Sequence, residues 1–214
     1  SADTAAAIDE NSGVAQVVYT ATADDSADTS GGISFSLAAG SDTALSIDSV
    51  TGAVTLNENP NFEAQSEYIF TTVATDTAGN ASQQAVSLAI NDLDEVAATI
   101  TSGDVAATID ENSGAGQVIY TATADDSADI SGGLTYSLVA GSDAALSVDS
   151  TTGEVSLAAD PDYETQNQYS FTVLATDAAG NSADQTVSLS IANKDEVAPA
   201  ITRSEERRVG KECR

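Results

Sequence analysis

The chain repeats itself with a period of 101 residues, and this repeat constrains its fold more than any other feature. All ten Phe and Tyr residues fall into pairs at that interval: Tyr19/Tyr120, Phe35/Tyr136, Phe62/Tyr163, Tyr68/Tyr169 and Phe70/Phe171. Acidic residues recur at the same spacing, so that Asp24-Asp25 returns as Asp125-Asp126. A period shared by apolar and acidic positions indicates one module copied in tandem.

One repeat is an ordinary size for a domain, so the 214 residues predict two domains. We expect the first at 1–94 and the second at 95–202. The second range includes the start of a third copy, because Glu196–Thr202 matches Glu95–Thr101. The match stops at Arg203. Residues 203–214 reverse the charge balance and lack a strand pattern, so we interpret them as a non-native or disordered tail.

Each copy contains about seven short apolar or alternating runs separated by turn residues, which is typical of a sandwich of strands. In the second copy, an opening strand is expected to precede strands at Gly116–Thr123, Leu134–Val139, Ala145–Val148, Glu154–Leu157, Gln168–Ala175 and Thr186–Ile191. Sequences such as Gly-Gly, Asp-Pro and Ala-Gly-Asn between the runs favour turns. The prediction is an all-β chain of two tandem seven-stranded antiparallel β-sandwiches, with the aromatic pairs in their cores.

The charge is strongly negative, with 34 acidic residues against 6 basic ones. Five of the basic residues lie in the last twelve positions, which leaves 31 acidic residues against Lys194 in the rest of the chain. Nucleic acid and anionic membranes bind clustered Lys and Arg, so neither is an expected partner. A cation is expected instead, and because self-repulsion opposes folding, bound divalent ions should stabilise the fold.

The sequence contains no residue pattern that predicts catalysis or membrane insertion. The chain has no His, its one cysteine (Cys213) lies in the tail, and its Ser residues have no candidate base. Asp162 and Glu164 could be a glycosidase pair, but two residues apart they would lie side by side rather than on both sides of a sugar. No apolar run approaches the length of a membrane span. A body without disulfides suits a secreted bacterial protein.

Calcium takes six to eight oxygen ligands, and each copy offers acidic residues at four places that the loops of a sandwich can bring together. These places are the end of the first short strand, the segment after a proline, the segment after the last strand, and an acidic pair combined with a later Asp. The residues are Glu10 and Glu111; Asn61, Glu63, Asp162 and Glu164; Asp92, Leu93, Asp94, Glu95, Asp195 and Glu196; and Asp24, Asp25, Asp76, Asp125, Asp126 and Asp177.

At these positions the chain resembles the cadherin repeat, and the resemblance covers both copies. The matching segments are Ile109–Asn112, Asp162–Glu164, Val173–Asp177 and Asp92–Glu95. They correspond to the family's x-Glu-x, Asp-x-Glu, Val-x-Ala-x-Asp and linker motifs. The variant is similar to the bacterial cadherin-like repeats of large surface adhesins of the RTX or biofilm type. The resemblance implies a Greek-key sandwich that binds calcium at the junction between repeats.

Carried over residue by residue, the resemblance implies one complete junction and two half-sites at the ends. Asn61 stands where the family has Asp, Ala124-Asp125-Asp126 is not a true Asp-x-Asp, and Val96 replaces the final Asn of the linker. The choice between Asp125 and Asp126 is therefore open, and roughly two or three ions are expected. The junction would use Glu10, Glu63, Asp94, Glu95, Asp125 or Asp126, and Asp177. The half-sites would be Asp24, Asp25 and Asp76, and Glu111, Asp162, Glu164, Asp195 and Glu196.

These observations predict a monomeric extender of a secreted or cell-surface bacterial adhesin, stiffened by Ca²⁺ between neighbouring repeats of the same chain. One alternative is direct binding of carbohydrate or protein, which requires an exposed aromatic or apolar patch. A second is homophilic adhesion. A merely solvated acidic surface would explain Asp42, Asp48, Asp143 and Asp149 but not acids at all the ligand positions. The segment Asp76–Asn80 could be a local metal loop, although Gly-Asn more often forms a left-handed turn.

Overall fold

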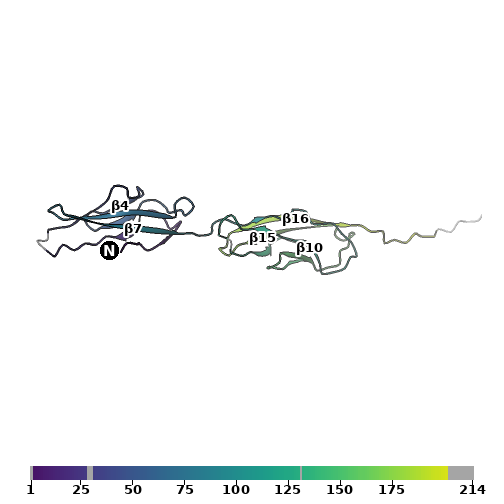
Figure 1. Ribbon diagram of the computed structural model, residues 1–214. Helices are drawn as coiled ribbons and strands as arrows, with labels where there is room; N and C mark the ends of the chain where they lie inside the picture. Colours follow the sequence, from purple (N-terminus) through teal and green to yellow (C-terminus); the bar gives the residue numbers. More distant parts are fainter. Residues whose placement is uncertain (1, 28–30, 131, 202–214) are drawn as a thin grey trace, which may run out of the picture. The chain divides into compact units, whose positions relative to one another are not determined.

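The computed structural model describes residues 2–27, 31–130 and 132–201. The chain divides into two compact units between Glu95 and Val96, and each unit is built from β-strands (Figure 1). The tail predicted at 203–214 lies outside the described residues.

Unit 1 is a two-sheet sandwich. A four-stranded sheet has the order β1-β7-β6-β3, and a three-stranded sheet has the order β2-β5-β4. All pairings are antiparallel except one: β1 runs parallel to β7, with Ile8 opposite Ile90. The strands are β1 (Ile8–Asp9), β2 (Gln16–Thr20), β3 (Ser34–Leu37), β4 (Leu45–Ile47), β5 (Ala53–Leu56), β6 (Glu67–Thr75) and β7 (Ala81–Asn91). The predicted seven-stranded sandwich is confirmed. The parallel β1–β7 pair departs from the expected antiparallel pairing, and the isolated bridge between Thr4 and Ser87 is parallel as well.

Unit 2 repeats both sheets and adds a strand pair. Its sheets have the orders β12-β15-β16-β9 and β10-β14-β13, and β8 pairs with β11. Among the described residues of unit 1, no strand pair corresponds to β8 and β11. The strands are β8 (Thr99–Ile100), β9 (Ile109–Asp110), β10 (Gln117–Thr121), β11 (Ala124–Asp125), β12 (Thr135–Leu138), β13 (Leu146–Val148), β14 (Glu154–Leu157), β15 (Gln168–Thr176) and β16 (Ser182–Ala192).

The core of each unit lies between its two sheets. Tyr68 and Phe70 on β6 alternate with more exposed residues and are buried, as the two-residue period of a strand requires. The ring of Tyr19 packs edge-on against Phe70 with centroids 5.6 Å apart, and unit 2 repeats this contact with Tyr120 and Phe171 at 5.7 Å. Phe35 departs from the prediction that all aromatic residues are core residues. Like five other aromatic residues it is only half-buried, but those five pack against a core cluster, whereas Phe35 lines a surface groove.

A tight turn between β4 and β5 packs against the backbone that follows β2. Gly52 has a φ of 72°. This left-handed conformation is unfavourable for residues that carry a Cβ atom. The Gly52 carbonyl accepts a hydrogen bond from the Ala21 N–H at 2.8 Å, and a Cβ atom at Gly52 would lie 2.4 Å from the Ala21 carbonyl oxygen. The position therefore requires glycine both for its backbone conformation and for lack of space.

The replacement Gly52→Ala should destabilise the fold more than Gly40→Ala. Gly40 also has positive φ, 93°, but a Cβ atom added there would have nothing within 4 Å. Gly40→Ala therefore isolates the conformational cost, about 1–2 kcal/mol, and Gly52→Ala should lose more because it adds the collision. Urea unfolding followed by circular dichroism measures both losses. Equal losses would show that the close approach to Ala21 carries no cost.

Candidate metal centre

Acidic side chains from separate segments converge at one pole of each unit. In unit 1 Glu10 follows β1, Glu63 lies between β5 and β6, and Glu95 follows β7. One carboxylate oxygen of each lies within 4.8 Å of the others. A carboxylate oxygen of Asp92 also lies within 4.8 Å of one from Glu63. The fold thus brings together four residues that the sequence marked as candidates at three different places.

Unit 2 builds a related cluster, with acidic residues from two of the corresponding segments. Oxygens of Glu111, Asp162 and Glu164 lie within 4.8 Å of one another. Asn193, which follows β16, donates a hydrogen bond from Nδ2 to Glu164 Oε1 at 3.1 Å. Each unit therefore gathers acidic side chains at this pole, although the residues that form the two clusters are not all at corresponding positions.

Glu10 organises the pole of unit 1. Its side chain is only 1% exposed, and its two oxygens accept hydrogen bonds from different loops. Oε2 accepts the Phe62 N–H at 2.9 Å, and Oε1 accepts the Leu93 N–H at 2.7 Å. These backbone hydrogen bonds, from Leu93 first and then Phe62, outweigh burial and hold the pKa of Glu10 below its usual value. The residue is therefore a carboxylate at neutral pH.

Glu111 occupies the equivalent position in unit 2. It accepts the backbone N–H groups of Lys194 and Tyr163, the latter at 2.9 Å, and these two hydrogen bonds lower its pKa. Leu93 and Lys194 therefore contribute to these poles through their N–H groups, which the sequence motif alone does not reveal.

An asparagine beside each buried Glu was missed by the sequence analysis. Asn11 has a φ of 55° and donates a hydrogen bond from Nδ2 to Glu95 Oε1. Asn112, with a φ of 54°, does the same to Glu196 Oε1. Asn tolerates left-handed backbone better than most residues. Its recurrence in both copies, directly after the buried Glu, was the available signal.

The carboxylates at the pole of unit 2 repel one another. The backbone N–H of Glu164 favours its ionised form, but burial and the negative charges of Glu111 and Glu196 raise the pKa of Glu164 overall. Lys194 does not relieve this crowding directly, since its ammonium pairs with Asp110 at 2.8 Å in an exposed salt bridge. Accumulated negative charge on oxygen ligands is the chemistry that favours a hard divalent cation.

The mid-repeat segment tolerates either Asp or Asn at its first position. Asn61 Oδ1 accepts the Ala64 N–H at 2.7 Å, and Asp162 Oδ1 accepts the Thr165 N–H at 3.0 Å. Both side chains cap the same short turn, which a neutral amide oxygen does as well as a carboxylate. In the segment after β16, Asp195 caps a turn in the same manner, because its Oδ1 accepts the Val197 N–H at 3.1 Å.

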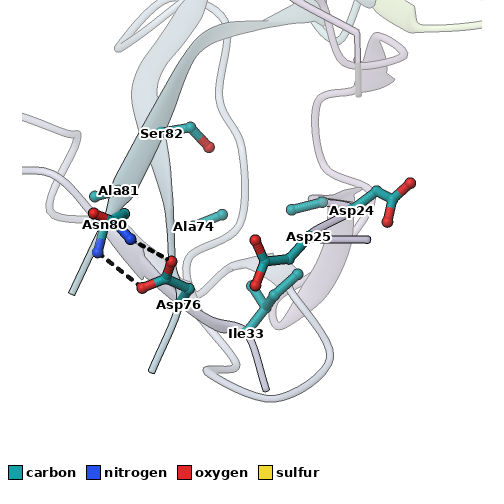
Figure 2. A pocket seen from close by; sticks show the side chains of 9 residues that line it. Asp24, Asp25, Ile33, Ala74, Asp76, Asn80, Ala81 and Ser82 are labelled. Carbon is teal, nitrogen blue, oxygen red and sulfur yellow. Dashed lines mark hydrogen bonds between the residues drawn. The ribbon is translucent and has the colours of Figure 1, made fainter. Parts of the chain in front are cut away.

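The three residues of the predicted half-site in unit 1 line a pocket at the opposite pole. Asp24, Asp25 and Asp76 line one pocket with Ile33 and Asn80, and Figure 2 shows the Asp24 carboxylate turned away from Asp76. Both Asp76 oxygens accept hydrogen bonds at 2.8 Å from Asn80, one from its N–H and one from Nδ2. The local Asp76–Asn80 loop is therefore a turn closed by its own hydrogen bonds.

In unit 2 the corresponding residues are Asp125, Asp126 and Asp177. Oxygens of Asp126 and Asp177 lie within 4.8 Å of each other, whereas Asp125 lies in β11 and its Oδ1 accepts the Ser127 N–H at 3.1 Å. Asp177 Oδ1 accepts the N–H groups of Gly180 at 2.7 Å and Asn181 at 2.8 Å. Asp177 Oδ2 is buried and has no hydrogen-bond partner among the described residues. Burial opposes ionisation of Asp177, but the hydrogen bonds from Asn181 and Gly180 lower its pKa.

Two stretches of the chain, 4–91 and 105–192, match the family model of the cadherin domain. Human Protocadherin Fat 1 is 29% identical over 178 residues, which are 80% of this chain and 4% of that protein.

Among the described residues, no helix is long and apolar enough to cross a membrane.

Solved structures of cadherin fragments share the fold. Mouse Cadherin-23 EC22-24 has a TM-score of 0.65 and 24% identity, over 88% of this chain and 63% of that one. Drosophila N-cadherin EC1-4 has a TM-score of 0.67 and 24% identity, over 89% and 47%. Human Protocadherin-24 EC1-2 has a TM-score of 0.68 and 16% identity, over 90% and 95%.

The replacement Glu10→Gln should lower the melting temperature in the presence of a chelator more than Glu63→Gln does. One Glu10 oxygen would become an amide NH₂ facing a backbone N–H, so a buried donor would lose its acceptor. Glu63 is exposed, and its replacement removes charge without leaving a buried donor. Thermal melts followed by circular dichroism compare the two. If both variants melt together, the buried carboxylate has no special role in holding the loops.

Proposed function

Because this chain belongs to the cadherin family, whose domains are extracellular adhesion modules rather than enzymes, we propose that its two units bind Ca²⁺ at their junction. The observation that carries the proposal is the cluster of carboxylates at the same pole of both units: Glu10, Glu63 and Glu95 in one, and Glu111, Asp162 and Glu164 in the other. Crowded carboxylate oxygens are the ligands that calcium prefers.

We propose Glu10, Glu63, Asp94 and Glu95 as ligands from unit 1, and Asp126 and Asp177 as ligands from unit 2. Two features of unit 2 support the choice of Asp126 and Asp177 as ligands. Asp126, rather than Asp125, approaches Asp177. The Asp177 Oδ2 atom is buried without a hydrogen-bond partner among the described residues, and a buried carboxylate oxygen is costly unless something compensates its charge. A calcium ion would supply that compensation.

Calcium bound to oxygens of both units would couple them mechanically. Without the ion, carboxylates at the linker repel one another and the units can pivot. With it, ligands from both units share one cation and the pivot is restricted. Such a chain would act as a monomeric extender that holds an adhesive domain away from a cell surface. The bound ion would supply electrostatic attraction, and the positions of the ligands in the two units would determine where the ion binds.

The bacterial adhesin setting is also a proposal. Its support is compositional: the only cysteine, Cys213, lies among the last residues, so disulfides cannot stabilise the two units. The relatives described above are animal proteins, and the chain spans 4% of Protocadherin Fat 1. Expression of the intact parent protein on a bacterial surface, with adhesion measured in calcium and in chelator, would test this setting.

Calcium should raise the melting temperature and restrict the relative motion of the units. Extracellular calcium sites typically have dissociation constants of about 10⁻⁴–10⁻³ M, and a hundredfold excess of ion over the dissociation constant stabilises a fold by about 2.7 kcal/mol per site. Small-angle scattering should fit one arrangement of the units in calcium and require an ensemble in chelator. Identical scattering would contradict the stiffening, and an identical melt would also contradict the binding.

The replacements Asp177→Asn and Asp76→Asn form a matched pair, because these residues occupy the same position in the two copies. In a polypeptide of these 214 residues, only Asp177 has a unit preceding it. Asp177→Asn should therefore reduce calcium affinity and the calcium-dependent rise in melting temperature, and Asp76→Asn should leave both nearly unchanged. Isothermal titration calorimetry and thermal melts measure these effects, with melts in chelator as the control for folding. Equal losses from both variants would argue against a site at the junction.

A further inference from the structure

The poles of the two units differ by one basic residue. After the last strand, residues 92–95 of unit 1 include three acidic residues and no basic one. The corresponding residues 193–196 of unit 2 include two acidic residues and Lys194, which stands in the place of Leu93. All other basic residues of the sequence lie at Arg203 or beyond. The one basic residue in the part of the chain that the structure describes therefore lies at a pole that is otherwise acidic.

Both the backbone and the side chain of Lys194 have partners in unit 2. Its N–H donates a hydrogen bond to Glu111 Oε1, and its ammonium lies 2.8 Å from Asp110 Oδ2. Because the backbone contacts Glu111 directly, the ammonium lies within one side-chain length of the pole. That length is shorter than the Debye length at physiological ionic strength, about 8 Å. The positive charge is therefore only partly screened from the carboxylates of the pole.

The corresponding contact in unit 1 is neutral. Asn91 donates a hydrogen bond from Nδ2 to Asp9 Oδ1 at 2.8 Å, and unit 2 has Ala192 in the place of Asn91. Both contacts link the chain at or just after the last strand to the first short strand, so this link does not require a positive charge. Asp9 is paired with a neutral amide, whereas Asp110 is paired with an ammonium.

Two further replacements at the poles cancel each other in charge. Asn193 stands in the place of Asp92, and Asp162 stands in the place of Asn61. One acidic residue is thus lost from the segment after the last strand, and one is gained in the mid-repeat segment. Lys194 is therefore the net difference in charge between the segments that hold the candidate ligands at the two poles.

We propose that Lys194 lowers the affinity of the unit 2 pole for divalent cations, so that this pole binds Ca²⁺ more weakly than the pole of unit 1. The inference rests on the calcium binding proposed above and adds a residue that sets the affinity of one site. The carboxylates of Glu111, Asp162 and Glu164 still attract a cation. The ammonium repels it, and a doubly charged ion meets twice the repulsion of a singly charged one. As calcium falls, the pole of unit 2 loses its ion first.

Terbium luminescence measures cation binding at this pole separately. Tb³⁺ is a hard cation that takes oxygen ligands as Ca²⁺ does, and it emits when a nearby tyrosine is excited. Tyr163 lies beside the cluster, because its N–H donates to Glu111 Oε2 at 2.9 Å, whereas unit 1 has Phe62 at that position. The part of the signal that Tyr163→Phe removes belongs to the pole of unit 2. Competition with Ca²⁺ converts this signal into a calcium affinity.

The replacement Lys194→Leu, which introduces the residue found in unit 1, should raise the calcium affinity of this pole about threefold to tenfold. Lys194→Arg keeps the charge and should leave the affinity unchanged. The gain from Lys194→Leu should shrink at about 1 M salt, where the Debye length is about 3 Å. Melting in chelator is the control for folding, because the Lys194 side chain is 55% exposed and loss of an exposed salt bridge costs little stability.

The reciprocal replacement is Leu93→Lys in unit 1. It keeps the backbone N–H that Glu10 accepts and adds the charge that unit 2 carries. The calcium-dependent rise in melting temperature should therefore become smaller, while the melting temperature in chelator stays nearly the same. An unchanged calcium response of Leu93→Lys would show that a cation at this position does not affect calcium binding.

Four results would overturn the role of Lys194. They are a calcium affinity unaltered by Lys194→Leu, an equal gain from Lys194→Arg, a gain that persists at high salt, and absence of Tyr163-dependent luminescence from both the unsubstituted chain and Lys194→Leu. The calcium binding proposed between the units is tested separately by Asp177→Asn. If Asp177→Asn behaves as expected and Lys194→Leu does not, the role of Lys194 alone is wrong.

Discussion

A buried carboxylate at the end of the first strand holds each pole together, and the arrangement of the other acidic residues depends on it. Glu10 accepts N–H groups from the mid-repeat loop, at Phe62, and from the segment after β7, at Leu93. A desolvated carboxylate requires such donors, so these two segments are held beside it. They carry Glu63 and Glu95, whose oxygens then lie within 4.8 Å of Glu10. Glu111 has the same role in unit 2.

This arrangement concentrates negative charge at one pole of each unit, at a cost to the stability of the module without a bound cation. The pKa of Glu164 is raised for this reason, because burial and the negative charges of Glu111 and Glu196 disfavour its ionised form. A fold that binds a cation at such a place is stabilised by the ion through mass action. Under the calcium binding proposed above, the stability of the module would therefore depend on the calcium concentration. The membership of the chain in the cadherin family fits this physical reading.

The two units are close copies in sequence but differ in structure at one edge. β8 and β11 pair in unit 2, and the matching residues of unit 1, Ala23 and Asp24, lie beside an open groove. In unit 2 the segment directly after Glu95 supplies β8 to this edge. The sequence period therefore does not coincide with the structural unit. A strand of two residues such as β11 has too little local preference to be recognised from sequence and exists through its pairing with β8.

The sequence alone determined the two-module organisation, the all-β class, most strands of the second copy and the acidic places. Those features follow from short-range periodicity and from the 101-residue repeat. The tertiary structure decided the parallel pairing of β1 with β7, the partial exposure of Phe35, and the approach of Asp126 rather than Asp125 to Asp177. It also showed that the Asn11 side chain donates a hydrogen bond to Glu95. These features depend on contacts between residues far apart in the chain, where local preference carries no information about which loop closes against which.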